Sequence, residues 1–222
     1  MNESSNKLTT HNFTGGNLSV LQFLGVALKL TKQLKEIHEL SSRHGSINQS
    51  SVIIDEKTLE VNLLEPDYNY VGSNPTVNLD VLNLHYISPE QTGRINQTID
   101  HRSDFYSLGT IFYYLLTGKP TVDSMDPLEI IHAQLAIIPP SPNSINSSIP
   151  VGLSNIIMKL LQKSPKDRYQ TAQGVLVDIK ECIEQFQSTG DIKSFDLGVG
   201  DEIGQLRFIK KLYGREKEIE SL

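Results

Sequence analysis

The first residues in the chain that could do chemistry are Gly15-Gly16, because glycine-rich loops can cradle phosphate groups. They lack the G-x-G-x-x-G spacing, and no strand and lysine follow them, so a nucleotide-binding loop is not predicted here. Cys182 is the only thiol and falls on the apolar face of a helical pattern, where a core role is expected. Lys163, Lys166 and Arg168 lie close together, and we interpret them as a solvated turn with one buried arginine. None of these groups predicts a reaction by itself.

The strongest structural signal is an apolar helix expected between Ser103 and Gly118. Its apolar residues recur at steps of three and four, and tyrosines occupy the remaining faces, so this helix should be buried centrally. Ser103 is expected to cap the helix, Asp104 lies in its first turn, and Gly118 follows its last apolar residue. The triplet Ser88-Pro89-Glu90 places a carboxylate just before the loop that leads into this helix.

The sequence predicts further helices and a β-hairpin before and after this central helix. An apolar stripe that includes Leu21, Leu24 and Leu34 predicts a helix ending near His38. Two short apolar runs, 52–55 and 59–64, separated by a turn, predict a small β-hairpin. Further helices are expected after Pro127 and Pro150, and Thr171 is expected to cap the last helix.

Three motifs in a fixed order carry a family resemblance. Ser88-Pro89-Glu90 is followed by Asp104 to Gly109 and, much later, by Asp167-Arg168-Tyr169. This order around a buried helix resembles the C-terminal lobe of protein kinases, in which the first motif closes the activation segment. The segments YISPEQTGR, IDHRSDFYSLG and LLTGKP are most similar to the kinase-like domains at the start of large hybrid sensor histidine kinases. The resemblance implies a mainly α fold, a kinase C-lobe with a small β-hairpin.

The resemblance also assigns structural roles to four residues. Glu90 should pair with Arg168 far downstream, and the pair should be buried. Asp104 should hold the catalytic loop from below. His44 should pack beneath that loop. These roles concern the scaffold and not the reaction.

The positions that carry phosphoryl transfer in the family hold other residues here. Kinases use an Asp as the base, an Asn and a second Asp for magnesium, and a Lys on the phosphates of ATP. The resemblance places Ser46 at the base, Ser51 at the Asn, and Glu65 at the first position of the metal-binding triplet. The hydroxyl of Ser46 cannot act as a carboxylate base, and Ser51 is a poorer magnesium ligand than an amide. The family would use ATP and magnesium, but no intact catalytic site and no metal site is predicted here.

The domain organisation follows from the same comparison with kinases. Residues 1–12 are polar and expected to be a disordered tail, and 13–186 are expected to form the kinase-like C-lobe. Residues before Phe13 leave no room for an N-lobe, so the N-lobe is expected to be missing. Residues 187–210 read as a polar linker, and 211–222 resemble the start of an AAA-type ATPase module.

Composition excludes several classes of function. The 222 residues carry a net charge of −6 and no basic run, so binding to nucleic acid is not predicted. The longest apolar run, Val20 to Leu30, is too short to cross a bilayer, so no membrane contact is predicted. With 38% hydrophobic residues, the chain should form one medium hydrophobic core. With a single cysteine it cannot form a disulfide within the chain, and a cytoplasmic location is expected.

Two classes of function remain, with a fragment without an independent role as a third. The first is a degenerate kinase-like C-lobe, a pseudokinase that binds a protein partner through the face on which an N-lobe would sit. The second is an active Ser/Thr protein kinase that belongs to a larger signalling protein. Ser46 and Ser51 favour the first class.

Overall fold

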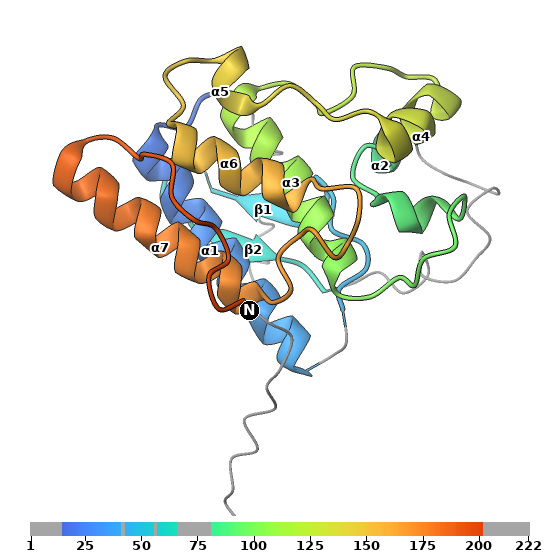
Figure 1. The fold of residues 1–222 in the computed structure, drawn as a ribbon, viewed down its shortest axis with the longest axis horizontal. Coiled ribbons are helices and arrows are strands. Elements are labelled where there is room, and N and C mark those ends of the chain that lie inside the picture. The colour runs from blue at the N-terminus through green and yellow to red at the C-terminus, as the bar shows by residue number, and fades with distance from the viewer. Residues whose placement is uncertain (1–14, 41–42, 56, 66–80, 202–222) are drawn as a thin grey trace, which may run out of the picture.

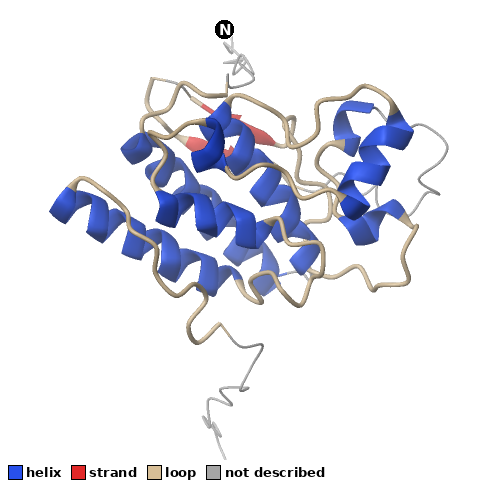
Figure 2. Ribbon diagram, turned by 45° about the horizontal axis from the view of Figure 1, so that its top comes forward, coloured by secondary structure: helices blue, strands red, loops and turns tan. Residues whose placement is uncertain are grey.

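The computed structural model describes residues 15–40, 43–55, 57–65 and 81–201. Within them the chain is mainly helical, with one two-stranded sheet, as Figures 1 and 2 show. The mainly α fold with a small hairpin is therefore confirmed. None of the described helices is long and apolar enough to cross a membrane. The elements are α1 (Val20–Leu40), β1 (Val52–Ile54), β2 (Val61–Leu63), α2 (Val81–Leu84), the 3-10 helix η1 (Pro89–Thr92), α3 (Arg102–Thr117), α4 (Pro127–Ala136), α5 (Pro142–Ile145), α6 (Val151–Leu160) and α7 (Ala172–Thr189).

Helix α3 is the central element that the sequence predicts. Thirteen of its 16 residues are buried, which fits a helix with apolar and aromatic residues on all faces. It packs beside α6 at Gly109, where a Cβ atom would come within 2.8 Å of the Cβ of Leu160. Gly118 ends α3 with a φ of 69°, a left-handed conformation that glycine adopts without strain.

The N-terminus of α3 differs from the prediction. The helix begins at Arg102 with His101 at the cap position, so the expectation that Ser103 caps it was wrong. Ser103 lies inside the first turn, and its hydroxyl donates a hydrogen bond to Glu90 instead. The physical reason is tertiary, because a buried carboxylate needs donors and Ser103 supplies one.

Helix α1 lies beside α7 and β2 (Figure 1). Its buried apolar residues are Phe23, Leu24, Val26, Ala27, Leu30 and Leu34. The predicted stripe included Leu21, but that side chain is 52% exposed. The hairpin pairs antiparallel with Val52 opposite Leu63, and both of these side chains are buried.

The C-terminal part of the bundle extends beyond the expected domain boundary at residue 186. The hydroxyl of Thr171 accepts a hydrogen bond from the backbone of Gly174, so the predicted cap of α7 is present. Helix α7 continues to Thr189, and residues 190–201 return along α6, where Ile192 is buried and accepts a hydrogen bond from Gly152. The expected tail 1–12 and the expected module 211–222 lie outside the described residues, as does the end of the expected linker.

Candidate functional site

The loop of residues 44–51, which the resemblance equates with the catalytic loop, is held by a carboxylate from α3. Asp104 is 1% exposed and accepts hydrogen bonds from the backbone N–H groups of His44 and Gly45, both at 2.7 Å. The Nε2 atom of His38, near the end of α1, lies 2.8 Å from the same carboxylate. Asp104 therefore joins two helices to the loop, at the place where the resemblance put it.

The side chain of His44 makes two further hydrogen bonds that fix the loop. Its Nε2 donates to the carbonyl oxygen of Leu64 at 2.8 Å, and its Nδ1 accepts from the backbone N–H of Ser46 at 3.3 Å. These two bonds require the tautomer with hydrogen on Nε2, because a carbonyl only accepts. His44 is 1% exposed and ties the loop to the chain that leaves β2.

The three positions expected to carry chemistry hold side chains with different surroundings. Ser46 is half-buried, and its Oγ lies 3.5 Å from His44 Nδ1. The hydroxyl of Ser51 is already committed, because it accepts from Asn48 N at 2.9 Å and donates to Asn48 O at 3.0 Å. Glu65 is exposed at the end of the described segment. Among the described residues, no three His, Cys, Asp or Glu side chains gather as a metal site requires.

Two residues that the sequence did not single out shape this loop. Asn48 Oδ1 accepts from the backbone N–H groups of Ser50 and Ser51, and its Nδ2 donates to the carbonyl of Ser46. This is an Asx-type turn, and the Asn-rich polar sequence was the available signal for it. Gln91, in η1, donates to the carbonyl of Gly45 at 2.9 Å and had no such signal.

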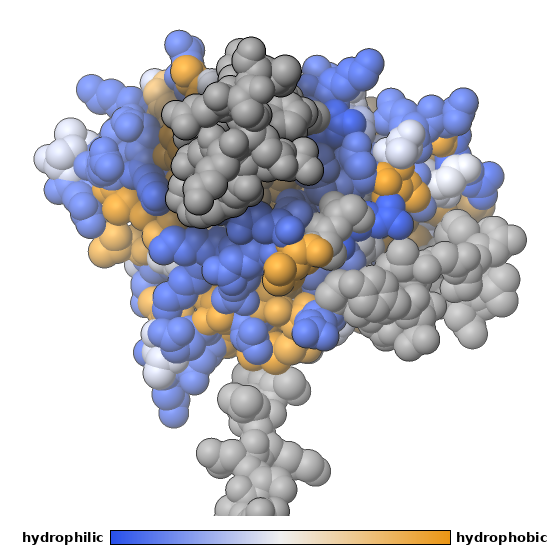
Figure 3. Space-filling view, turned by 90° about the horizontal axis from the view of Figure 1, so that it is seen from below, coloured by the Kyte–Doolittle hydropathy of each residue, from blue (hydrophilic) through white to orange (hydrophobic). Residues whose placement is uncertain are grey.

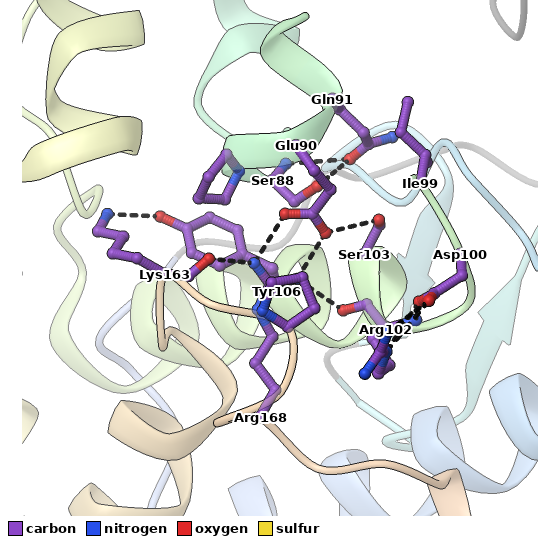
Figure 4. A network of polar contacts seen from close by, with 12 residues as sticks. Ser88, Glu90, Gln91, Ile99, Asp100, Arg102, Ser103, Tyr106, Lys163 and Arg168 are labelled. Carbon is purple, nitrogen blue, oxygen red and sulfur yellow. Dashed lines mark hydrogen bonds and ion pairs between the residues drawn. The ribbon is translucent and has the colours of Figure 1, made fainter. Parts of the chain in front are cut away.

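The ion pair expected between Glu90 and Arg168 is present (Figure 4). Two parallel hydrogen bonds of 2.7 and 2.8 Å join the carboxylate to the guanidinium, and both side chains are fully buried. Ser103 donates a further bond of 2.7 Å to the carboxylate. Burial would raise the pKa of Glu90, but the hydrogen bonds and charge of Arg168 outweigh burial and lower that pKa.

Lys163 extends this network and corrects an interpretation made from the sequence. It does not lie in a fully solvated turn, since its ammonium donates to the Tyr106 hydroxyl at 2.9 Å and to the carbonyl of Ala133 at 3.1 Å (Figure 4). Burial, together with the nearby charge of Arg168, lowers the pKa of Lys163 to about 8. Lys166 is exposed, as expected.

The remaining candidates have structural roles. A Cβ at Gly15 would lie 2.4 Å from the carbonyl oxygen of Tyr114, and Gly16 donates a backbone hydrogen bond to Leu115, so this glycine pair packs on the end of α3. Cys182 is buried, and burial, with nearby carboxylates, raises the pKa of its thiol to about 12. Such a thiol is unreactive at neutral pH.

Comparisons with known proteins identify similar sequences in protein kinases and hybrid histidine kinases. The protein kinase domain family model matches residues 4–179. Hybrid signal transduction histidine kinase G of Dictyostelium discoideum is 39% identical over 158 residues, which are 62% of this chain and 5% of that protein. A probable serine/threonine-protein kinase of Clostridium acetobutylicum is 30% identical over 172 residues, 74% of this chain and 25% of that protein. The peroxide stress-activated histidine kinase mak3 of Schizosaccharomyces pombe is 25% identical over 215 residues, 89% of this chain and 9% of that protein.

The matched region is thus a small part of each of these relatives, at most 25% of their length. It nevertheless covers most of this chain, and the family model alone spans well over half of it. The described residues carry the mainly α architecture that the resemblance implied. The chain belongs to the protein kinase domain family.

Proposed function

We propose that the chain is a catalytically degenerate kinase-like C-lobe, a pseudokinase that serves as a binding or regulatory module for a protein partner. The observation that carries the proposal is the chemistry of the loop held by Asp104. Ser46 stands where the family has its base, and a neutral hydroxyl does not accept a proton at neutral pH as a carboxylate does.

The fit of ATP and magnesium to this loop supports the same proposal. Magnesium prefers carboxylate, phosphate and water oxygens in octahedral geometry. Ser51 is 8% exposed. Its hydroxyl accepts one hydrogen bond from the backbone of Asn48 and donates another to it. Among the three described positions, only Glu65 offers a carboxylate. These residues do not fit magnesium in the manner of the family, so phosphoryl transfer is not part of the proposed function.

The contacts that hold the kinase-like scaffold together are present, although Ser46 and Ser51 replace the catalytic groups of the family, and this supports a binding role. Asp104 and the Glu90–Arg168 pair hold the loop and the bundle in place. Figure 3 shows one face of the molecule, on which hydrophobic patches lie between hydrophilic residues. In the segments expected to face a partner, Leu21 and Leu64 are 52% and 39% exposed. Within the two strands, Ile53 is half-buried and the other apolar residues are buried.

An active Ser/Thr protein kinase is the second candidate, and one observation favours it. The loop keeps the supports that position catalysis in the family, and Glu65 presents an exposed carboxylate beside it. Several relatives bear the name serine/threonine-protein kinase.

A calorimetric titration with ATP, with and without magnesium, separates the two candidates. We expect no magnesium-dependent binding by the wild-type chain and the same result for Glu65→Ala. Glu60→Ala is the matched control, because Glu60 is an exposed glutamate of the hairpin and lies outside the loop. Magnesium-dependent binding that Glu65→Ala abolishes and Glu60→Ala retains would overturn the degenerate assignment.

A further inference from the structure

Residues 190–201 run back along α6 and α7 and form a segment that we call the strap (Figure 1). Its buried anchor is Ile192. Further along, the backbone N–H of Gly198 donates a hydrogen bond of 2.8 Å to Asp178. Most of the other residues of the strap are exposed. Segments with few buried apolar contacts are the ones that open locally while the rest of a protein stays folded, so the strap is suited to do this.

The end of the strap is held at Gln170, just before α7. The carboxylate of Asp201 accepts hydrogen bonds from the backbone N–H of Gln170 at 2.7 Å and from both the backbone and the hydroxyl of Thr171. Gln170 is bonded in turn to the start of α3. Its carbonyl oxygen accepts from Nε2 of His101 at 2.8 Å, and its Oε1 accepts from Arg102 at 3.0 Å. Asp201 therefore fixes a residue that also contacts α3.

From His101 the contacts continue to the loop of residues 44–51. The ring of His101 packs edge-on against that of His38, with the centroids 5.5 Å apart. Nε2 of His38 lies 2.8 Å from the Asp104 carboxylate, which accepts the backbone N–H groups of His44 and Gly45. Because carbonyl and carboxylate oxygens only accept, both imidazoles carry hydrogen on Nε2, and their acceptors set the orientation of each ring. Each contact thus positions the next one.

We propose that the strap is a conformational switch: when docked it keeps the loop of residues 44–51 ordered, and release of its end loosens that loop. Without Asp201, the backbone N–H of Gln170 loses its acceptor, and the Gln170 carbonyl is no longer held where His101 donates to it. The switch acts on the order of the loop whether or not the chain transfers phosphate. A molecule that binds the strap only in its released form would therefore loosen the loop.

Amide hydrogen exchange of the full chain, followed by NMR, tests this coupling. Asp201→Ala removes the acceptor of three hydrogen bonds. We expect the amides of His44 and Gly45 to exchange at least about 5-fold faster, the factor that corresponds to the loss of one hydrogen bond. Asp196→Ala is the matched control, because Asp196 is an exposed aspartate of the same strap, and it should leave both rates unchanged. Unchanged exchange of His44 and Gly45 in Asp201→Ala would overturn the proposal.

The amide of Phe112 separates local loosening from a loss of global stability. Removing Asp201 also weakens the start of α7, so amides that exchange only on global unfolding should become faster too. Phe112 is buried in the middle of α3 and provides such an amide. We expect its rate to rise less than the rates of His44 and Gly45. An equal rise at all three amides would mean that only global stability changed, and that result would contradict the switch.

His101→Phe tests the route from the strap to the loop. Phenylalanine keeps an aromatic ring beside His38 and removes the donor to the Gln170 carbonyl. We expect faster exchange of the loop amides in this variant and little further change when Asp201→Ala is added, because the link is already broken. His132→Phe, at an exposed histidine of α4, is the control and should leave the effect of Asp201→Ala intact. A full effect of Asp201→Ala in the His101→Phe background would overturn the proposed coupling.

Discussion

At the scale of single residues, Arg168 is a charged side chain that lies fully buried in the bundle. A guanidinium has five N–H donors, and the buried Arg168 makes five hydrogen bonds. Two go to Glu90, and the others go to the carbonyl oxygens of Gln162, Lys163 and Arg102. Full pairing offsets the cost of burying the charge, so the loss of either partner leaves the other uncompensated.

Replacement of Arg168 by alanine should therefore lower the free energy of unfolding by about 3–5 kcal/mol, because the carboxylate of Glu90 stays buried. Urea denaturation measures this loss. Lys35→Ala is the control, since it removes an exposed pair with Glu39 on α1, and such pairs contribute only about 0.3–0.5 kcal/mol. A loss for Arg168→Ala as small as that of the control would contradict the buried ion pair as a main source of stability.

The same pair predicts a dependence of stability on acid. The pKa of Glu90 is lower in the folded chain than its ordinary value of 4.5. Its contribution is therefore complete above about pH 4.5 and is lost as the pH falls through the lower folded pKa. Denaturation at a series of pH values should show wild-type stability falling more steeply below pH 4.5 than that of Glu90→Gln, which has no carboxylate to protonate at this position. Parallel pH profiles would argue against the shift.

At the scale of elements, the start of α7 depends on a residue from the returning C-terminal segment. The carboxylate of Asp201 accepts from the backbone N–H groups of Gln170 and Thr171 at 2.7 and 2.9 Å, and from the Thr171 hydroxyl at 2.6 Å. A carboxylate near a helix N-terminus also interacts favourably with the helix dipole. Gly174 makes room for it, because a Cβ there would lie 2.2 Å from the Asp201 Cγ.

Gly174→Ala should consequently destabilise the chain, although alanine normally favours a helix by about 0.5–1 kcal/mol over glycine. The added methyl group displaces the Asp201 carboxylate and removes its hydrogen bonds, each worth about 1 kcal/mol. Gly25→Ala in α1 is the matched control, because no atom lies within 4 Å of its Cβ position, and it should stabilise the chain. Thermal denaturation compares the two variants. If both stabilise the chain, Asp201 does not hold α7.

At the scale of the whole molecule, the bundle positions a loop that we propose has lost the groups needed for phosphoryl transfer. Phosphoryl transfer depends mainly on the positioning of ATP and on electrostatic stabilisation by several groups together. A general base alone contributes about a hundred- to ten-thousandfold. Repair of one position should therefore not restore turnover.

We expect no phosphate incorporation into a generic Ser/Thr peptide by the wild type, by Ser46→Asp, or by Ser46→Asp combined with Ser51→Asn. Radiolabelled ATP with magnesium provides the measurement, and an active kinase of the same family serves as the positive control. Circular dichroism should show that the variants remain folded. Turnover by the wild type that Glu65→Ala abolishes would contradict the degenerate assignment and support the second candidate.

The sequence by itself determined the order of the elements and the family. Motifs such as Ser88-Pro89-Glu90 and the run from Asp104 to Gly109 are local, and the apolar period of α3 is read along one segment. Glycine at position 118 and threonine at 171 mark helix ends through conformational preferences of single residues. The resemblance then paired Glu90 with Arg168 across the chain.

Only the tertiary structure decided which hydrogen-bond partners the buried polar groups have. The hydroxyl of Ser103 bonds to Glu90 rather than capping α3, and Lys163 lies against Tyr106 rather than in water. Asp201 acquired its role from the backbone N–H groups of Gln170 and Thr171, which the fold places beside it. The physical reason is that hydrogen-bond satisfaction and burial depend on neighbours distant in sequence, whereas helix period and end signals depend on residues a few positions apart.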